Sequence, residues 1–128
     1  MQTQPCKGTV VVVDDEQDTR ELICELVEAR GYRVVSAEDG VAALEVLATV
    51  EQVCFVVLDL VMPRMDGFGV LRALAADPRL RGVNVCVSTS APDRAPPGVP
   101  CLAKPIDVDR LLSIIDERCS SEAQNCSA

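Results

Sequence analysis

The chain has 128 residues and a mass of 13.7 kDa, which is the size of one compact domain. Its 20 acidic and 12 basic residues give a net charge of −8, and only 2% of the residues are aromatic. An acidic surface with so few aromatic side chains repels phosphate backbones and offers no base-stacking platform, which argues against direct nucleic-acid binding. No apolar run approaches the roughly 20 residues of a membrane span, and no secretory signal precedes the first apolar run. We therefore expect a cytoplasmic protein without membrane insertion.

Seven cysteines are a high count for this length, yet their pattern predicts no metal site. The number is odd, no CxxC pair occurs and the chain has no histidine, so the spacing of zinc ligands is absent. Cys54, Cys86 and Cys101 lie in apolar stretches, where a thiol serves as a small hydrophobic group. Cys119 and Cys126 lie near the end of the chain, where disorder is common. We assign the cysteines no chemistry.

Apolar runs typical of buried strands alternate along the chain with segments of helical periodicity. The first run, Thr9–Val13, is β-branched and uninterrupted, which predicts a strand buried on both faces. Glu16–Arg30 then carries an apolar stripe at helical spacing, and Gly31 ends that helix. The later elements are predicted in chain order as a strand at Arg33–Ala37, a helix at Gly40–Ala48, a strand at Val53–Leu58, a helix capped by Asp66, strands at Val83–Ser88 and Cys101–Ala103, and a helix from about Val108 to Cys119.

Strands that are separated by single helices pair in parallel through right-handed crossovers. Five such strands predict an α/β fold, a doubly wound, flavodoxin-like parallel sheet with strand order 2-1-3-4-5. Residues 1–128 then form one domain, with a core at about 7–119 and a frayed polar tail at 120–128. The fourth crossover differs, because Ser90–Pro100 holds four prolines and each proline costs a helix interior roughly 3 kcal/mol. We expect the fourth helix to be missing or reduced to a loop or a single turn.

Polar groups follow four of the predicted strands, at the edge where open α/β sheets bind their ligands. Asp14–Glu16 follows the first strand and Asp59 the third, while Ser88–Ser90 ends the fourth and Lys104 follows the fifth. Each group alone has a structural explanation, since acids after a strand are commonly a turn and a helix cap. Their joint occurrence at one edge of the sheet indicates a functional site.

Four stretches of the sequence match a known family when they are taken together. They are Val10–Glu16, which ends in two aspartates and a glutamate, the stretch DLVMPRMDG at Asp59–Gly67, the Ser-Thr-Ser-Ala run at Ser88–Ala91, and Lys104-Pro105. Over about residues 7 to 119 the chain thereby resembles the receiver domains of two-component response regulators. The stretch DLVMPRMDG is the most specific part of the resemblance.

The resemblance implies a phosphoacceptor signalling domain, in which Asp59 receives a phosphoryl group from a histidine kinase or a phosphotransfer protein and partner binding is switched. Such a domain is not an enzyme in the usual sense, although it catalyses its own phosphorylation and dephosphorylation at Asp59. The implied cofactor is Mg²⁺, and its implied ligands are Asp14, Asp15, Asp59 and the backbone carbonyl of Val61.

Thr89 and Lys104 have implied roles at the phosphoryl group: the resemblance has the Thr89 hydroxyl bind a phosphoryl oxygen and the Lys104 ammonium pair with it. It also implies a cis peptide bond between Lys104 and Pro105. The charges agree with this assignment, because like charges about 4 Å apart repel by roughly 4 kcal/mol at an effective dielectric of 20. Three clustered carboxylates therefore require a cation, and a ligand set made only of oxygens suits Mg²⁺.

Two departures from the family pattern keep an alternative function open. Only 15 positions separate Thr89 from Lys104, and Cys101 stands where receivers usually carry an aromatic residue. The alternative is a phosphorylation-independent protein–protein interaction module with a vestigial acidic site. Other classes lack their motifs: Val61 replaces the second aspartate of haloacid-type phosphatases, and no GxxxxGK[ST] loop is present for nucleoside triphosphates.

Overall fold

The computed structural model of the chain describes residues 8–60, 62, 66–80 and 82–126. Five strands form one parallel sheet in the order β2-β1-β3-β4-β5, which confirms the predicted fold class and strand order. The strands are β1 (Thr9–Val13), β2 (Arg33–Ala37), β3 (Val53–Asp59), β4 (Asn84–Thr89) and β5 (Cys101–Ala103). The helices are α1 (Gln17–Ala29), α2 (Gly40–Thr49), α3 (Gly67–Ala76) and α4 (Val108–Cys126), with a short 3₁₀ helix, η1 (Pro92–Arg94), before β5.

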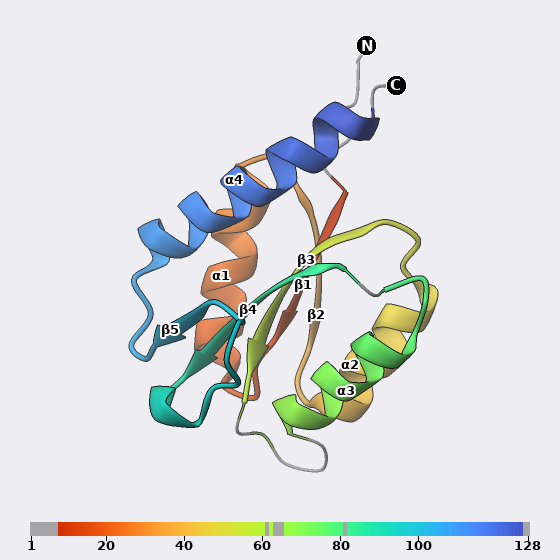
Figure 1. Ribbon diagram of the computed structural model, residues 1–128. Helices are drawn as coiled ribbons and strands as arrows, with labels where there is room; N and C mark the ends of the chain where they lie inside the picture. Colours follow the sequence, from red (N-terminus) through yellow and green to blue (C-terminus); the bar gives the residue numbers. More distant parts are fainter. Residues whose placement is uncertain (1–7, 61, 63–65, 81, 127–128) are drawn as a thin grey trace.

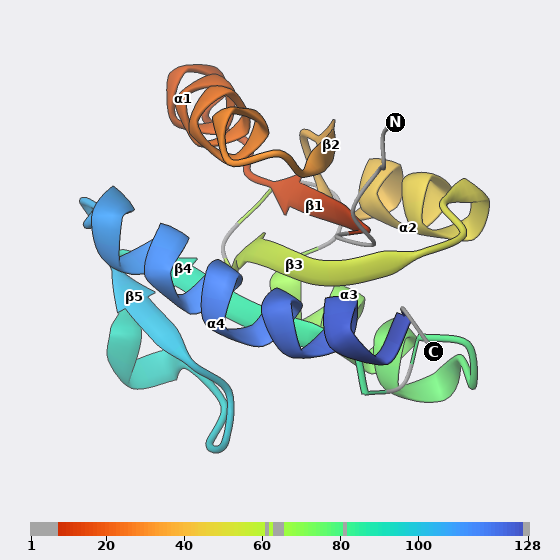
Figure 2. The same cartoon turned by 90° about the horizontal axis from the view of Figure 1, so that it is seen from above.

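Helices cover both faces of the sheet, as Figures 1 and 2 show. Helices α1 and α4 pack on one face, here called the α1/α4 face, and α2 and α3 pack on the other, the α2/α3 face. Val10 and Val12 of β1 contribute to the core on the α1/α4 face, whereas Val11 and Val13 contribute to the core on the α2/α3 face. All four side chains are fully buried. This two-sided burial explains why the strand reads as a continuous apolar run.

Two of the helices begin at aspartates, and the one at Asp66 confirms the predicted cap. The Asp39 carboxylate accepts a hydrogen bond from the Ala42 N–H at the start of α2, and the Asp66 carboxylate accepts one from the Gly69 N–H at the start of α3. Each bond satisfies a backbone donor that has no partner inside the helix. The cap at Asp66 places the start of α3 close behind the end of β3, which carries Asp59.

The fourth crossover contains η1 and no α-helix, which confirms the prediction from its prolines. The N–H of Arg94 donates to the Ala91 carbonyl at 3.0 Å, which closes a single turn. After that turn the chain passes through Gly98, whose φ of +85° is favourable for glycine, and enters β5. The α2/α3 face therefore receives no helix from this crossover.

The last helix is longer than predicted. Helix α4 continues to Cys126, so the predicted end at Cys119 is wrong. Residues 120–126 include neither glycine nor proline, so none of them opposes a continuing helix. The placement of Cys119 near a disordered end is also wrong: its side chain is fully buried, and its Sγ lies 2.9 Å from the Sγ of Cys54. Cys54 and Cys86 are buried as predicted.

Polar contacts join α4 to the loop between α1 and β2. Asp116 of α4 accepts a hydrogen bond from the hydroxyl of Tyr32 at 2.8 Å and pairs with Arg30. Burial of Tyr32 and this hydrogen bond raise the pKa of its hydroxyl well above the usual range. Within the described part of the chain, no helix is long and apolar enough to cross a membrane.

Candidate functional site

The polar groups that follow the strands lie together at the carboxyl edge of the sheet. Val13 pairs with Leu58 across β1 and β3, and Asp59 pairs with Ser88 across β3 and β4. Because the strands are parallel and in register, the residues that follow Val13 and Leu58 end at the same level of the sheet. The fold therefore brings the acids after β1 next to the aspartate that ends β3.

Three carboxylates form the centre of the site. Asp14 is 1% exposed and Asp59 is 3% exposed, whereas Asp15 is exposed to solvent. One oxygen of each carboxylate lies within 4.8 Å of the others. The turn after β1 orients Asp14, because its Oδ1 accepts a hydrogen bond from the Glu16 N–H at 2.8 Å. The structure thus brings the three predicted side-chain ligands of a cation together.

Lys104 faces two of these carboxylates. Its Nζ lies 3.1 Å from Oδ2 of Asp59 and 3.2 Å from Oδ2 of Asp14. Burial of the ammonium acts to lower its pKa, but the hydrogen bond to Asp59 and the charges of Asp14 and Asp59 outweigh burial, so the pKa of Lys104 is raised. The peptide bond between Lys104 and Pro105 is cis, as predicted.

Two more groups were predicted for the site, the hydroxyl of Thr89 and the backbone carbonyl of Val61. Thr89 ends β4 with its side chain fully buried, and its Oγ1 accepts a hydrogen bond from the Ala91 N–H at 3.0 Å. In this structure the hydroxyl therefore stabilises the turn that leaves the strand. The backbone carbonyl of Val61, the fourth predicted ligand, lies outside the described residues.

Two residues that sequence reasoning missed support the site from outside. Arg20 of α1 donates from Nη1 to the backbone carbonyl of Asp14 at 2.9 Å. Gly67, the first residue of α3, leaves no room for a side chain, because a Cβ there would lie 2.6 Å from the backbone oxygen of Asp59. The glycine at the end of DLVMPRMDG was a visible signal for such a close approach. No pattern in the sequence indicated the contact of Arg20.

The carboxylate cluster fits a divalent cation. Oδ2 of Asp14 is buried and has no hydrogen-bond partner among the described residues, although the Lys104 ammonium is within ion-pair distance. The three side chains offer only oxygen ligands, and carboxylates at this separation repel one another unless a cation lies between them. Such a donor set is typical of Mg²⁺ sites.

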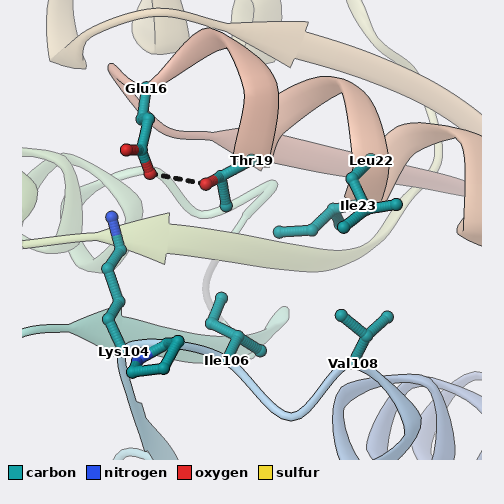
Figure 3. Close-up of a pocket in the computed structure, with 8 residues that line it drawn as sticks. Glu16, Thr19, Leu22, Ile23, Lys104, Ile106 and Val108 are labelled. Carbon is teal, nitrogen blue, oxygen red and sulfur yellow. Dashed lines mark hydrogen bonds between the residues drawn. The ribbon is translucent and has the colours of Figure 1, made fainter.

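A cavity of about 450 Å³ opens beside the carboxylates, between the start of α1 and the chain that links β5 to α4. Figure 3 shows polar groups at one end, where Glu16 accepts a hydrogen bond from Thr19, and apolar side chains at the other. Leu22, at 48% exposed, is the one large apolar side chain that is exposed among the described residues. The cavity is lined by Glu16, Thr19, Leu22, Ile23, Lys104, Pro105, Ile106 and Val108.

The fold and the site together define a flavodoxin-like α/β domain that carries a carboxylate cluster and a paired lysine at the carboxyl edge of its sheet. The family model described as the response regulator receiver domain matches residues 10–116. The chain belongs to this family, as its sequence predicted.

Curated relatives match about half of the chain. The chain is 41% identical over 68 residues to a probable transcriptional regulator, ycf27, of Porphyridium aerugineum, and 43% identical over 65 residues to the response regulator MprA of Mycobacterium ulcerans. The aligned segments cover 53% and 51% of this chain but 28% of each relative. The matched segment therefore spans less than a third of the length of each of these relatives.

Solved structures of receiver domains share the fold. The receiver domain of the hybrid histidine kinase CckA has a TM-score of 0.75 at 29% identity, and the match covers 88% of this chain and 99% of that one. A receiver domain protein from Clostridium thermocellum has a TM-score of 0.78 at 23% identity, with 90% and 96% of the two chains covered. The shortened fourth crossover is accommodated within the same overall architecture.

Proposed function

We propose that the chain accepts a phosphoryl group on Asp59 in a Mg²⁺-dependent reaction, with a histidine kinase or a phosphotransfer protein as the donor. The observation that carries this proposal is the contact of the Lys104 ammonium, 3.1 Å from Oδ2 of Asp59, inside a cluster of three carboxylates. A buried carboxylate with an adjacent ammonium is a nucleophile in a setting that tolerates an incoming anion.

In the proposed reaction an oxygen of Asp59 forms a bond to phosphorus while the bond from phosphorus to the donor breaks, and the donor leaves with the electron pair. Mg²⁺ held by Asp14, Asp15, Asp59 and the Val61 carbonyl would offset the negative charge of the phosphoryl group. Lys104 pairs with the phosphoryl oxygens as they arrive. The Thr89 hydroxyl leaves the Ala91 N–H and turns to a phosphoryl oxygen, which changes the turn after β4.

Acetyl phosphate tests this function without any partner protein. The chain is incubated with Mg²⁺ and acetyl phosphate, and its intact mass is measured. We expect one phosphoryl adduct on the unmodified chain, and none on Asp59→Asn or in the presence of a chelator. The proposal fails if the unmodified chain gains no adduct, or if Asp59→Asn gains as much as the unmodified chain.

The cavity beside the site suits the docking of the protein that donates the phosphoryl group. Its polar end includes Lys104, which contacts Asp59, and its apolar end includes the exposed Leu22. A donor protein bound there would have its phosphoryl group within reach of Asp59. Leu22→Asp should slow transfer from a phosphorylated donor protein about tenfold while labelling by acetyl phosphate is unchanged, because the small donor needs no docking surface. Equal loss with both donors would contradict this role of Leu22.

One observation favours the alternative function, an interaction module that ignores phosphorylation. The proline-rich segment that contains η1 stands in place of a helix, and its prolines stiffen it. A movement of the Thr89 side chain would therefore displace the segment after β4 less. The discriminating measurement is amide exchange over residues 88–100 with and without beryllofluoride, a mimic of the phosphoryl group, in the presence of Mg²⁺. Unchanged exchange, together with unchanged partner affinity, would favour the constitutive module.

A further inference from the structure

Ser88 is a buried polar residue for which the proposed reaction has no role. Its side chain is 1% exposed, and its Oγ has no hydrogen-bond partner among the described residues. A buried hydroxyl without a partner lowers stability, because it loses its hydrogen bonds to water and gains none in return. An alanine in the same position would avoid that cost, so the presence of a hydroxyl here requires an explanation.

The hydroxyl lies on the same face of the sheet as the nucleophile. Ser88 pairs with Asp59 across β3 and β4, and with Leu102 across β4 and β5. Paired residues of adjacent strands project from the same face, and Leu102 belongs to the core on the α1/α4 face. Cys86, two residues before Ser88 on the same strand, belongs to that core as well. Ser88 is therefore the neighbour of Asp59 on the α1/α4 face.

Lys104 reaches across the strand that carries Ser88. It follows β5, and its ammonium contacts Asp59 on β3, while β4 lies between these two strands. The side chain must therefore cross the end of β4 to make this contact. When the ammonium turns from the carboxylate to a phosphoryl group, Asp59 loses the hydrogen bond that Lys104 now supplies to Oδ2.

We propose that Ser88 is a further hydrogen-bonding residue of the phosphoacceptor site: its hydroxyl, which has no partner among the described residues of the unmodified chain, donates to the acyl oxygen of Asp59 once Lys104 has turned to the phosphoryl group. This inference rests on the proposed function. It assigns to Ser88 a hydrogen bond that exists in the modified state alone, so the hydroxyl is a cost before modification and a stabilising contact after it.

Thermal unfolding in Mg²⁺, with and without beryllofluoride, separates these two states. For Ser88→Ala we expect an unfolding temperature without beryllofluoride equal to or above that of the unmodified chain, because the unpartnered hydroxyl is gone. We expect the beryllofluoride concentration that gives half of the stabilising effect to rise about tenfold, which is near the upper end of the net contribution of one hydrogen bond. Ser36→Ala, an exposed serine of β2, is the matched control and should change neither quantity.

The outcomes are distinguishable. Unchanged beryllofluoride affinity in Ser88→Ala would overturn the role of Ser88 and leave the function of Asp59 standing. A lower unfolding temperature without beryllofluoride, with unchanged affinity, would also overturn it, since the hydroxyl would then stabilise the unmodified chain. If the unmodified chain itself does not respond to beryllofluoride, the proposed function fails, and the role of Ser88 fails with it.

Discussion

Replacing Lys104 with methionine tests whether the ammonium holds the carboxylate cluster together. Methionine retains most of the length and the apolar stem of the side chain but removes its charge. The variant then carries Asp14 and Asp59 as buried carboxylates without the ammonium that pairs with both. We expect it to fold with reduced stability at neutral pH in the absence of divalent cations.

The distances set the magnitude of this loss. Two carboxylate oxygens within 4.8 Å of each other repel by at least about 3.5 kcal/mol at an effective dielectric of 20. Removal of one partner of a buried ion pair typically costs about 3–5 kcal/mol. The Lys104 side chain is 21% exposed, so solvent screens part of the interaction. We therefore expect a loss of about 3 kcal/mol in the free energy of unfolding.

Urea unfolding measures this loss in the free energy of unfolding for three proteins: the unmodified chain, Lys104→Met and Lys104→Arg. Lys104→Arg is the matched control, because it keeps the positive charge. The deficit of Lys104→Met should be largest at pH 7 with a chelator. It should shrink when Mg²⁺ is added, because the cation then offsets the repulsion between the carboxylates. If Lys104→Met is as stable as Lys104→Arg at pH 7 without Mg²⁺, the carboxylates do not repel as the distances imply, and the electrostatic account of the site is refuted.

Two further predictions concern residues around the site and the far end of the sheet. Gly67→Ala should lower the free energy of unfolding by about 2 kcal/mol or more and slow phosphorylation by acetyl phosphate. The reason is that the added Cβ would lie 2.6 Å from the Asp59 backbone oxygen. An unchanged rate and an unchanged stability would show that α3 shifts freely. Tyr32 is the only tyrosine and the chain has no tryptophan, so its ionisation can be followed by near-ultraviolet absorbance. Burial and the hydrogen bond to Asp116 raise its pKa, so the folded chain should show no tyrosinate near pH 10, the usual value. The part of the folding free energy that depends on this raised pKa is complete below about pH 10 and is lost as the pH rises above it. Asp116→Asn should bring the ionisation of Tyr32 to lower pH. An ordinary tyrosine titration in the unmodified chain would contradict the contact with Asp116.

Local patterns in the sequence were sufficient to predict the architecture. The valines of Thr9–Val13 predicted a strand buried on both faces, because a parallel sheet covered by two helix layers leaves no polar face. The prolines of Ser90–Pro100 predicted the loss of a helix, since proline acts on its own backbone and on the preceding turn whatever the tertiary context. The groups that follow the strands were predicted to meet at one edge, because parallel strands end together.

Interactions between distant parts of the chain were decided by the tertiary structure alone. The end of α4 and the burial of Cys119 against Cys54 depend on how a helix at the end of the chain packs on a central strand, and no local signal reports that contact. Sequence spacing likewise could not tell that Asp14 is buried while Asp15 is exposed, because both follow the end of β1, where burial depends on what packs against the turn. The unpartnered hydroxyl of Ser88 is of the same kind, since having a partner is a property of the surroundings in three dimensions and not of the residue.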